Sequence, residues 1–294
     1  MSRHSRVRDT AEALLVSFAA AGLGRLSPRR AEAGGRRLGS LLGRTAAPRR
    51  GLVRRNLALA FPERTPAEIG ALARDVYAHF GGLAAEILAT LDEPLDELLA
   101  RVEVENLETA RAAFAGKRGL FFLTPHLGSW ELAALATAAL GMPATVIARP
   151  LDNSRLEKRL RAFRERAGNT VVPKAEAARE ILRAIRSGGA VGILLDQHAR
   201  GADAVNVPFF GRPAATSSAL ARFVDRTEAL VVPATAIRIG PARYRLRFEE
   251  PIDVRTLSRE ERTPERLTAL LSSRMESQIR RAPEQWLWLH NRWK

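Results

Sequence analysis

The sequence predicts an α/β fold in which a mainly parallel, mixed sheet is covered by helices on both faces. From about residue 100 onward, short apolar runs alternate with helical patterns, and the runs are continuously apolar, as strands buried on both faces are. The length of 294 residues, 46% of them hydrophobic, allows a sizeable core. We therefore expect an α/β catalytic domain at 101–294, preceded by a helical N-terminal portion at 28–100.

The first 27 residues are predicted to be an amphipathic anchor that lies in the membrane interface. The apolar run at 13–24 is too short to span a bilayer, which needs roughly 20 apolar residues. An ordinary surface helix and a cleaved signal peptide are the alternatives. The signal peptide is disfavoured because Arg25, Arg29 and Arg30 stand where such a sequence should be uncharged.

Charge is concentrated at the N-terminus. The net charge is +15, and the first 60 residues hold 13 Arg against Asp9, Glu12 and Glu32. This asymmetry predicts an anionic partner, for which an anionic membrane surface fits the interspersed apolar residues. Nucleic acid is the alternative from another class, but no nucleic-acid-reading module is recognisable. The absence of Cys excludes disulfides, zinc sites built on thiolates and cysteine nucleophiles.

The elements follow in order along the chain. A basic segment at 48–62 predicts a helix closed by proline, and Thr65 with Pro66 predicts the start of the next helix. The later pattern predicts strands at 119–123, 144–148, 170–172, 190–195 and 229–237, and helices at 130–140, 154–166, 175–186, 214–227 and 266–281. The alternation at 243–248 predicts an antiparallel edge strand.

The candidate chemistry lies at 124–131, where a strand ends and a helix begins. His126 and Glu131 are five residues apart, which on an unbroken helix would separate them by about 140°. The break at Pro125 and Gly128 allows the two side chains to meet. A neutral imidazole oriented by a carboxylate is a general base for a hydroxyl nucleophile. A structural His that caps a helix is the alternative.

This segment resembles a known signature. The stretch HLGSWE at 126–131 is similar to the histidine, four residues, acid motif of glycerolipid-type acyltransferases, in the form found in bacterial lipid A biosynthesis acyltransferases that add secondary, lauroyl- or myristoyl-type chains. Further blocks resemble that family in order, at 56–62, 149–153, 196–197, 208–211, 213–216, 238 and 285–293. The resemblance therefore covers nearly the whole chain.

The resemblance implies an O-acyltransferase of lipopolysaccharide biosynthesis with a glycerolipid acyltransferase-like fold. It would move a fatty acyl chain from acyl-carrier protein to a hydroxyl of a membrane glycolipid, a lipid A precursor, at the cytoplasmic face of the bacterial inner membrane. His126 would be the base and Glu131 would hold the imidazole. No metal and no cofactor are implied. The alternatives are an acyl-coenzyme A donor with another glycolipid, such as a phosphatidylinositol mannoside, and a hydrolase that uses water.

Four further residues are predicted to bind substrate or support the oxyanion. Arg149 follows one strand, and Asp196 with Gln197 follows another, so all three face the crevice at the carboxyl ends of the sheet. We expect Arg149 and Asp196 to form a charge pair there. Gly128, within the motif, is the fourth candidate.

Aromatic residues near the motif blocks are candidates for an acyl groove. Trp130 lies within the signature itself, and Phe209 and Phe210 belong to a later block. For the two phenylalanines, a packed turn is the alternative.

Overall fold

The computed structural model describes residues 22–44, 49–151 and 153–294. Most of the predicted anchor, residues 1–21, lies outside this description. The helices are α2 Pro28–Arg44, α3 Arg50–Ala60, α4 Pro66–Thr90, α5 Leu95–Leu99, α6 Leu107–Ala115, α7 Trp130–Ala139, α8 Ser154–Glu165, α9 Ala177–Arg186, α10 Ala219–Thr227 and α11 Pro264–Arg281, with 3₁₀ turns η1 Lys174–Glu176, η2 Val254–Thr256 and η3 Pro283–Gln285. The strands are β1 Val102–Glu105, β2 Leu120–Thr124, β3 Ala144–Ala148, β4 Thr170–Pro173, β5 Ala190–Leu194, β6 Ala204–Phe209, β7 Arg212–Ser217, β8 Leu230–Gly240 and β9 Arg243–Phe248.

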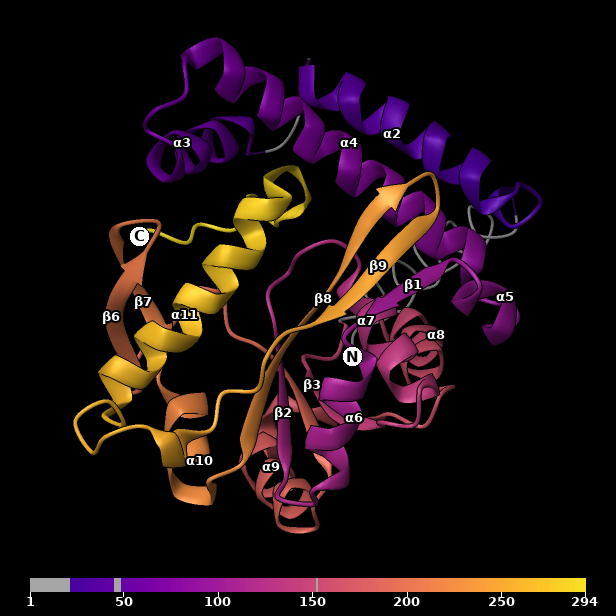
Figure 1. Cartoon of the computed structure of the whole chain (residues 1–294). Helices are drawn as coiled ribbons and strands as arrows, with labels where there is room; N and C mark the ends of the chain where they lie inside the picture. Colours follow the sequence, from indigo (N-terminus) through magenta and orange to yellow (C-terminus); the bar gives the residue numbers. More distant parts are fainter. Residues whose placement is uncertain (1–21, 45–48, 152) are drawn as a thin grey trace, which may run out of the picture.

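The predicted α/β fold is confirmed. Seven strands form one sheet in the order β1-β9-β8-β2-β5-β3-β4, and β8 with β9 is its antiparallel pair, so the sheet is mainly parallel and mixed (Figure 1). The strands β6 and β7 pair separately as an antiparallel hairpin. The central strand β2 lies between β8 and β5, so it positions whatever follows it at the middle of the sheet.

Both faces of the sheet are buried, which accounts for the continuously apolar strands. Along β2, Leu120 and Phe122 pack with residues of α6 and α7, whereas Phe121 and Leu123 pack with residues of α9, α10 and α11. All four side chains are buried. Removing each from water stabilises the fold by about 1.5–3 kcal/mol, which is why the strand carries no polar alternation.

Two predicted elements are corrected. The predicted helix at 214–227 begins as strand β7, and only Ala219–Thr227 is helical. Alanines favoured a helix in the sequence, but Ala214 and Thr216 are buried in the hairpin, where tertiary packing overrides propensity. The strand β9 is not an edge strand, because β1 pairs with its outer side. Its alternation arises from one buried face instead.

The helices that precede the sheet form a layer of their own. The capping box of Thr65 and Glu68 opens α4 as predicted. Helix α2 lies along α4 so closely that a Cβ added at Gly35, Gly39 or Gly81 would collide with the backbone of the other helix. Glycine is therefore required at this crossing. In the described part of the chain, no helix is long and apolar enough to cross a membrane.

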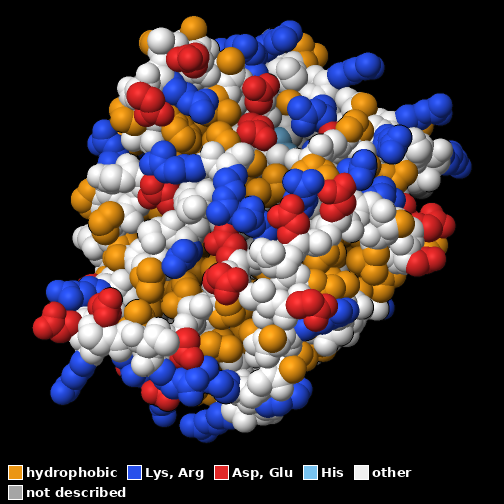
Figure 2. Space-filling model, viewed as in Figure 1, with side chains coloured by type: hydrophobic (Ala, Val, Ile, Leu, Met, Phe, Trp, Pro, Cys, Tyr) orange, Lys and Arg blue, Asp and Glu red, His pale blue; other side chains and the backbone are white. Residues whose placement is uncertain are grey.

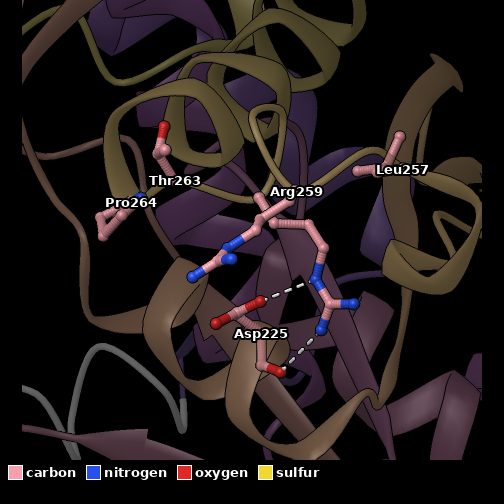
Figure 3. Close-up of a pocket in the computed structure, with 6 residues that line it drawn as sticks. Asp225, Leu257, Arg259, Thr263 and Pro264 are labelled. Atoms are coloured by element: carbon pink, nitrogen blue, oxygen red, sulfur yellow. Dashed lines mark hydrogen bonds and ion pairs between the residues drawn. The ribbon is translucent and has the colours of Figure 1, made fainter.

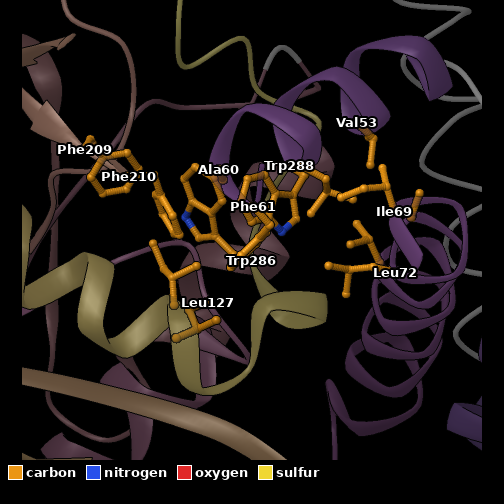
Figure 4. Packing of buried hydrophobic residues seen from close by; sticks show 14 of the residues in the cluster. Val53, Ala60, Phe61, Ile69, Leu72, Leu127, Phe209, Phe210, Trp286 and Trp288 are labelled. Atoms are coloured by element: carbon orange, nitrogen blue, oxygen red, sulfur yellow. The ribbon is translucent and has the colours of Figure 1, made fainter. Parts of the chain in front are cut away.

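The C-terminal segment joins this helical layer to the sheet. Its Trp286 and Trp288 are buried in a cluster with Val53 and Leu57 of α3 and with residues of α4 (Figure 4). The side-chain amide of Asn56 donates to the carbonyl oxygens of Trp288 and His290, both at 2.9 Å. The last residues of the chain are therefore fixed between α3, α4 and the carboxyl edge of the sheet.

Candidate active site

The candidate site lies at the carboxyl ends of two neighbouring parallel strands. His126 stands two residues beyond the end of β2, and Asp196 stands two residues beyond the end of β5. The last residues of these strands, Thr124 and Leu194, are register partners. The sheet thus brings the two side chains to one edge, where open α/β sheets place their ligands.

Asp196 holds the imidazole of His126. The Nδ1 atom of His126 lies 2.7 Å from Oδ1 of Asp196, and the backbone N–H of His126 donates to Oδ2 at 2.8 Å. The indole N–H of Trp286 donates to the same Oδ2 at 2.6 Å. The Asp196 side chain is 2% exposed, so its charge is stabilised by these donors rather than by water.

The electrostatics of this pair define its protonation. Burial alone would raise the pKa of Asp196, but the charge and donated hydrogen bonds of His126, with Trp286, outweigh burial and lower it. Burial alone would lower the pKa of His126, but the Asp196 carboxylate outweighs it and raises that pKa. A charged Asp196 requires the proton on Nδ1, which leaves Nε2 of the neutral ring as a proton acceptor.

The prediction that Glu131 holds the imidazole is wrong. The Glu131 carboxylate accepts two hydrogen bonds from the guanidinium of Arg164 on α8, at 2.8 and 2.5 Å. The first turn of α7 carries Glu131 toward α8, whereas Nδ1 of His126 faces β5. Glu131 still acts on the ring through space, because its negative charge contributes to the raised pKa of His126.

Gly128 has a structural task instead of the predicted support of the oxyanion. Its N–H donates to the carbonyl oxygen of Gln285 at 3.1 Å, and the N–H groups of Leu127 and Ser129 also donate to backbone carbonyls. Gly128 adopts a φ of +61°, and an added Cβ would collide with the carbonyl oxygen of Ala236. Glycine therefore allows the loop to approach β8 closely.

Gln197 and Trp130 flank the reactive side of the imidazole. The side-chain amide nitrogen of Gln197 lies 3.5 Å from Nε2 of His126, on an exposed side chain. The ring of Trp130 lies edge-on to His126 with 5.2 Å between centroids. Gln197 is thus the described amide donor nearest to the atom that would take the proton, and Trp130 forms an apolar wall beside it.

The predicted charge pair between Arg149 and Asp196 is wrong. Asp196 takes its hydrogen bonds from His126 and Trp286 and is fully buried, whereas Arg149 is exposed just beyond the end of β3. Arg149 is still at the carboxyl edge of the sheet, because β3 is the neighbour of β5. A guanidinium is a group that binds anionic substrate groups.

Phe209 and Phe210 are buried rather than open to a groove. Phe209 packs against Trp286 with centroids 5.7 Å apart, and Phe210 packs against Trp288 at 5.8 Å (Figure 4). Both belong to the hydrophobic cluster that joins α3, α4 and the C-terminal segment. Both residues therefore fit the alternative interpretation, a packed turn. The prediction that they line an acyl groove is wrong for both.

Three residues of the C-terminal segment, Gln285, Leu287 and Arg292, support the site although the sequence did not predict this role. Gln285 clamps the backbone of Arg238 through both atoms of its amide, at 2.9 and 3.0 Å, and the N–H of Leu287 donates to the carbonyl oxygen of His126. Arg292 is fully buried, where burial lowers its pKa to about 10, and it donates to the carbonyl oxygen of Gln197 at 3.3 Å. The similar block at 285–293 was the signal for these residues, although it did not reveal their contacts.

One hollow on the surface is lined by none of the candidate site residues. A hollow of 570 Å³ lies between α10 and the start of α11, lined by Asp225, Leu257, Arg259, Arg262, Thr263 and Pro264 (Figure 3). Arg262 is bound to Asp225 at 2.8 Å. The described residues contain no group of three His, Asp or Glu that would hold a metal ion.

Comparison with known proteins identifies the family. A family model described as bacterial lipid A biosynthesis acyltransferase matches residues 1–294. The lipid A biosynthesis myristoyltransferase of Escherichia coli (strain K12) is 25% identical over 86% of this chain and 77% of its own length. The palmitoleoyltransferase of the same organism is 26% identical over 87% and 84%, and the lauroyltransferase is 28% identical over 87% and 83%. The chain is an O-acyltransferase that belongs to the bacterial lipid A biosynthesis acyltransferase family.

Proposed function

We propose that this enzyme transfers a fatty acyl chain from acyl-carrier protein to a free hydroxyl of a membrane-embedded lipid A precursor, with His126 as the general base. The observation that carries the mechanism is the pairing of His126 Nδ1 with buried Asp196, which leaves Nε2 on the side of the exposed Gln197 side chain. The names of the similar transferases, which specify lipid A and a fatty acyl group, support the choice of acceptor and cargo.

The reaction follows from the protonation of the pair. Nε2 of His126 takes the proton of the acceptor hydroxyl while the oxygen attacks the carbonyl carbon of the thioester. The tetrahedral intermediate then collapses, the carbon–sulfur bond breaks, and the imidazolium returns the proton to the sulfur. The products are an ester and a thiol, and a positioned base of this kind contributes about 10²- to 10⁴-fold.

Asp196 acts throughout as the group that orients the ring and stabilises its charged form. Because Asp196 is buried and its hydrogen bonds also fix the His126 backbone, the imidazole loses little orientation when it is protonated. Gln197, whose amide lies beside Nε2, is the candidate donor to the oxyanion. Glu131, held by Arg164, adds negative charge near the imidazolium.

The two substrates would approach from the side of the exposed residues Gln197 and Arg149. Arg149 is suited to bind a phosphate of the acceptor or donor, and Trp130 is suited to line the path of the acyl chain. We place the enzyme at the cytoplasmic face of the bacterial inner membrane, with residues 1–27 as an interfacial anchor. The acceptor would then remain in the bilayer during transfer.

The test is a transfer assay with the purified full chain. The enzyme is incubated with a lipid A precursor that has a free hydroxyl and with either acyl-carrier protein or coenzyme A carrying the same acyl chain. The masses of the products are measured by mass spectrometry. We expect a mass gain of one acyl group with acyl-carrier protein, and none with His126→Ala. A mass gain of the acceptor with acyl-coenzyme A alone would contradict acyl-carrier protein as the donor. Consumption of the acyl donor without a mass gain of the acceptor would indicate a hydrolase.

A further inference from the structure

The outer side of α2 carries a hydrophobic patch. Six large hydrophobic side chains are exposed in the described residues, and four of them lie within 26–42: Leu26 at 41%, Leu38 at 59%, Leu41 at 56% and Leu42 at 45%. A single exposed leucine needs no explanation, but a group on one short segment indicates an interaction site.

Helical spacing sorts the side chains of α2 into rows. Leu38, Leu41 and Leu42 are three and four residues apart, so they share one side of the helix. Arg30, Arg37 and Arg44 recur every seven residues and therefore share another. The glycine side between α2 and α4 is closed by packing. The leucine and arginine rows together form the outward surface, which we call the α2 face.

The charge of the α2 face is entirely positive. The one acidic residue of α2 is Glu32, which is 3% exposed and turned inward toward Arg238. Among the ion pairs of the described residues, none includes Arg30, Arg37 or Arg44. Basic side chains protrude along the upper right edge of the molecule, where α2 lies, with hydrophobic atoms between them (Figures 1 and 2). Such a surface is complementary to an anionic one.

The α2 face is rigidly connected to the catalytic loop. Arg238 of β8 is bound by Glu86 of α4 at 2.7 Å and by Glu32 of α2 at 3.6 Å. The amide of Gln285 clamps the backbone of Arg238, and the carbonyl oxygen of Gln285 accepts the N–H of Gly128. This chain of buried contacts fixes α2 relative to the loop that carries the reactive imidazole.

We propose that the α2 face is a docking surface for an anionic lipid bilayer. The leucines enter the boundary between headgroups and acyl chains, and the arginines pair with lipid phosphates. A bilayer fits better than a second copy of the chain, which would bring rows of like charge together. The consequence rests on the proposed function: docking through α2 holds the enzyme where a membrane-embedded acceptor reaches the site.

Vesicle binding of the full chain tests this surface. The probe is vesicles of phosphatidylcholine with and without phosphatidylglycerol, and the variants are Leu38→Ser/Leu41→Ser/Leu42→Ser and Arg30→Gln/Arg37→Gln/Arg44→Gln. A matched control, Arg226→Gln/Arg259→Gln/Arg274→Gln, removes three exposed arginines elsewhere. Since each basic residue near anionic lipid contributes about 1 kcal/mol, we expect the α2 arginine variant to bind on the order of tenfold to a hundredfold more weakly, and the control to bind as wild type.

The leucine variant should also bind about tenfold more weakly, with a greater share of the remaining binding sensitive to salt. Wild-type binding by either α2 variant, or equal weakening by the control, would overturn the proposal. A wild-type dimer that the leucine variant converts to a monomer with unchanged vesicle binding would assign the face to a second copy instead. Acyl transfer to a detergent-dispersed acceptor separates the two proposals, because it needs no bilayer. The leucine variant should retain this transfer. If the wild type itself showed no transfer, the proposed function would be contradicted but the docking surface would not.

Discussion

Two carboxylates lie near His126, and the regions that carry them differ in construction. Glu131 belongs to the first turn of the same segment and is held by a single arginine from α8. Asp196 follows a strand 70 residues away and accepts three hydrogen bonds, two from His126 and one from Trp286. Spacing along the chain points to Glu131, whereas the pairing of β2 with β5 assigns the imidazole to Asp196.

The difference concerns how each negative charge is stabilised. Asp196 is fully buried and has no countercharge nearer than the His126 ring, so its ionisation and the protonation of the imidazole favour each other. The charge of Glu131 is instead paired with that of Arg164 in a partly exposed contact. We therefore expect changes at Asp196 to alter the chemistry of the base, and changes at Glu131 to alter it more weakly.

The largest effect is expected for His126→Ala. Removing Nε2 removes the base, so the turnover should fall by at least about 100-fold, and the melting temperature should also fall because buried Asp196 loses one of its hydrogen bonds. Turnover is measured with acyl-carrier protein as donor, and folding by circular dichroism. Retention of more than roughly a tenth of the wild-type turnover would remove His126 from the mechanism.

Asp196→Asn should come next, with a fall of about 10²- to 10⁴-fold in kcat/KM. The amide no longer selects the Nδ1–H tautomer or stabilises the imidazolium. Because the Asp196 charge raises the pKa of His126, its loss lowers that pKa, and the acidic limb of the pH profile should move to lower pH. A profile with an unmoved acidic limb would show that Asp196 does not face the base.

Glu131→Gln should reduce kcat/KM by about tenfold, less than Asp196→Asn, because it removes only a charge acting through space. Glu131→Gln and Arg164→Gln should each lower the free energy of unfolding by about 1–3 kcal/mol, since each leaves a partly buried charge without its partner. The double variant should lose less than the sum of the two. Additive losses in urea unfolding would contradict the ion pair.

Trp286→Phe should have the smallest effect. It keeps an aromatic ring in the cluster but removes the N–H that donates to Asp196, so the free energy of unfolding should fall by about 1.5 kcal/mol. The turnover should fall less than tenfold, because both hydrogen bonds from His126 remain. Thermal unfolding and the transfer assay measure the two quantities. A loss as large as that of Asp196→Asn would place Trp286 in the chemistry itself.

The sequence predicted the elements around the site well, because they depend on local signals. The apolar run of β2, the break at Pro125 and the helix start at Trp130 are each visible over a few residues. The placement of Asp196 at the same edge also followed, since parallel strands carry their ends together. These signals correctly predicted the strand, loop and helix around His126 and the position of Asp196 at the same edge of the sheet.

The pairing within that neighbourhood required the tertiary structure. Which carboxylate faces Nδ1 depends on the direction of the loop after β2, which is set by the contact of Gly128 with Gln285, a residue near the other end of the chain. Arg164 had no distinguishing signal among the 43 arginines of the sequence. The strand β1 was missed because it is short and its glutamates pair with arginines of β9.

The most direct test of the central claim, that Asp196 rather than Glu131 holds the imidazole, is nitrogen NMR of the chain labelled with ¹⁵N-histidine, with the His126 signals assigned by their loss in His126→Gln. We expect an Nδ1–H tautomer and a pKa raised above the ordinary value of histidine for His126 in the wild type. Both features should persist in Glu131→Gln and be lost in Asp196→Asn. The reverse pattern, with both features lost in Glu131→Gln and kept in Asp196→Asn, would contradict it.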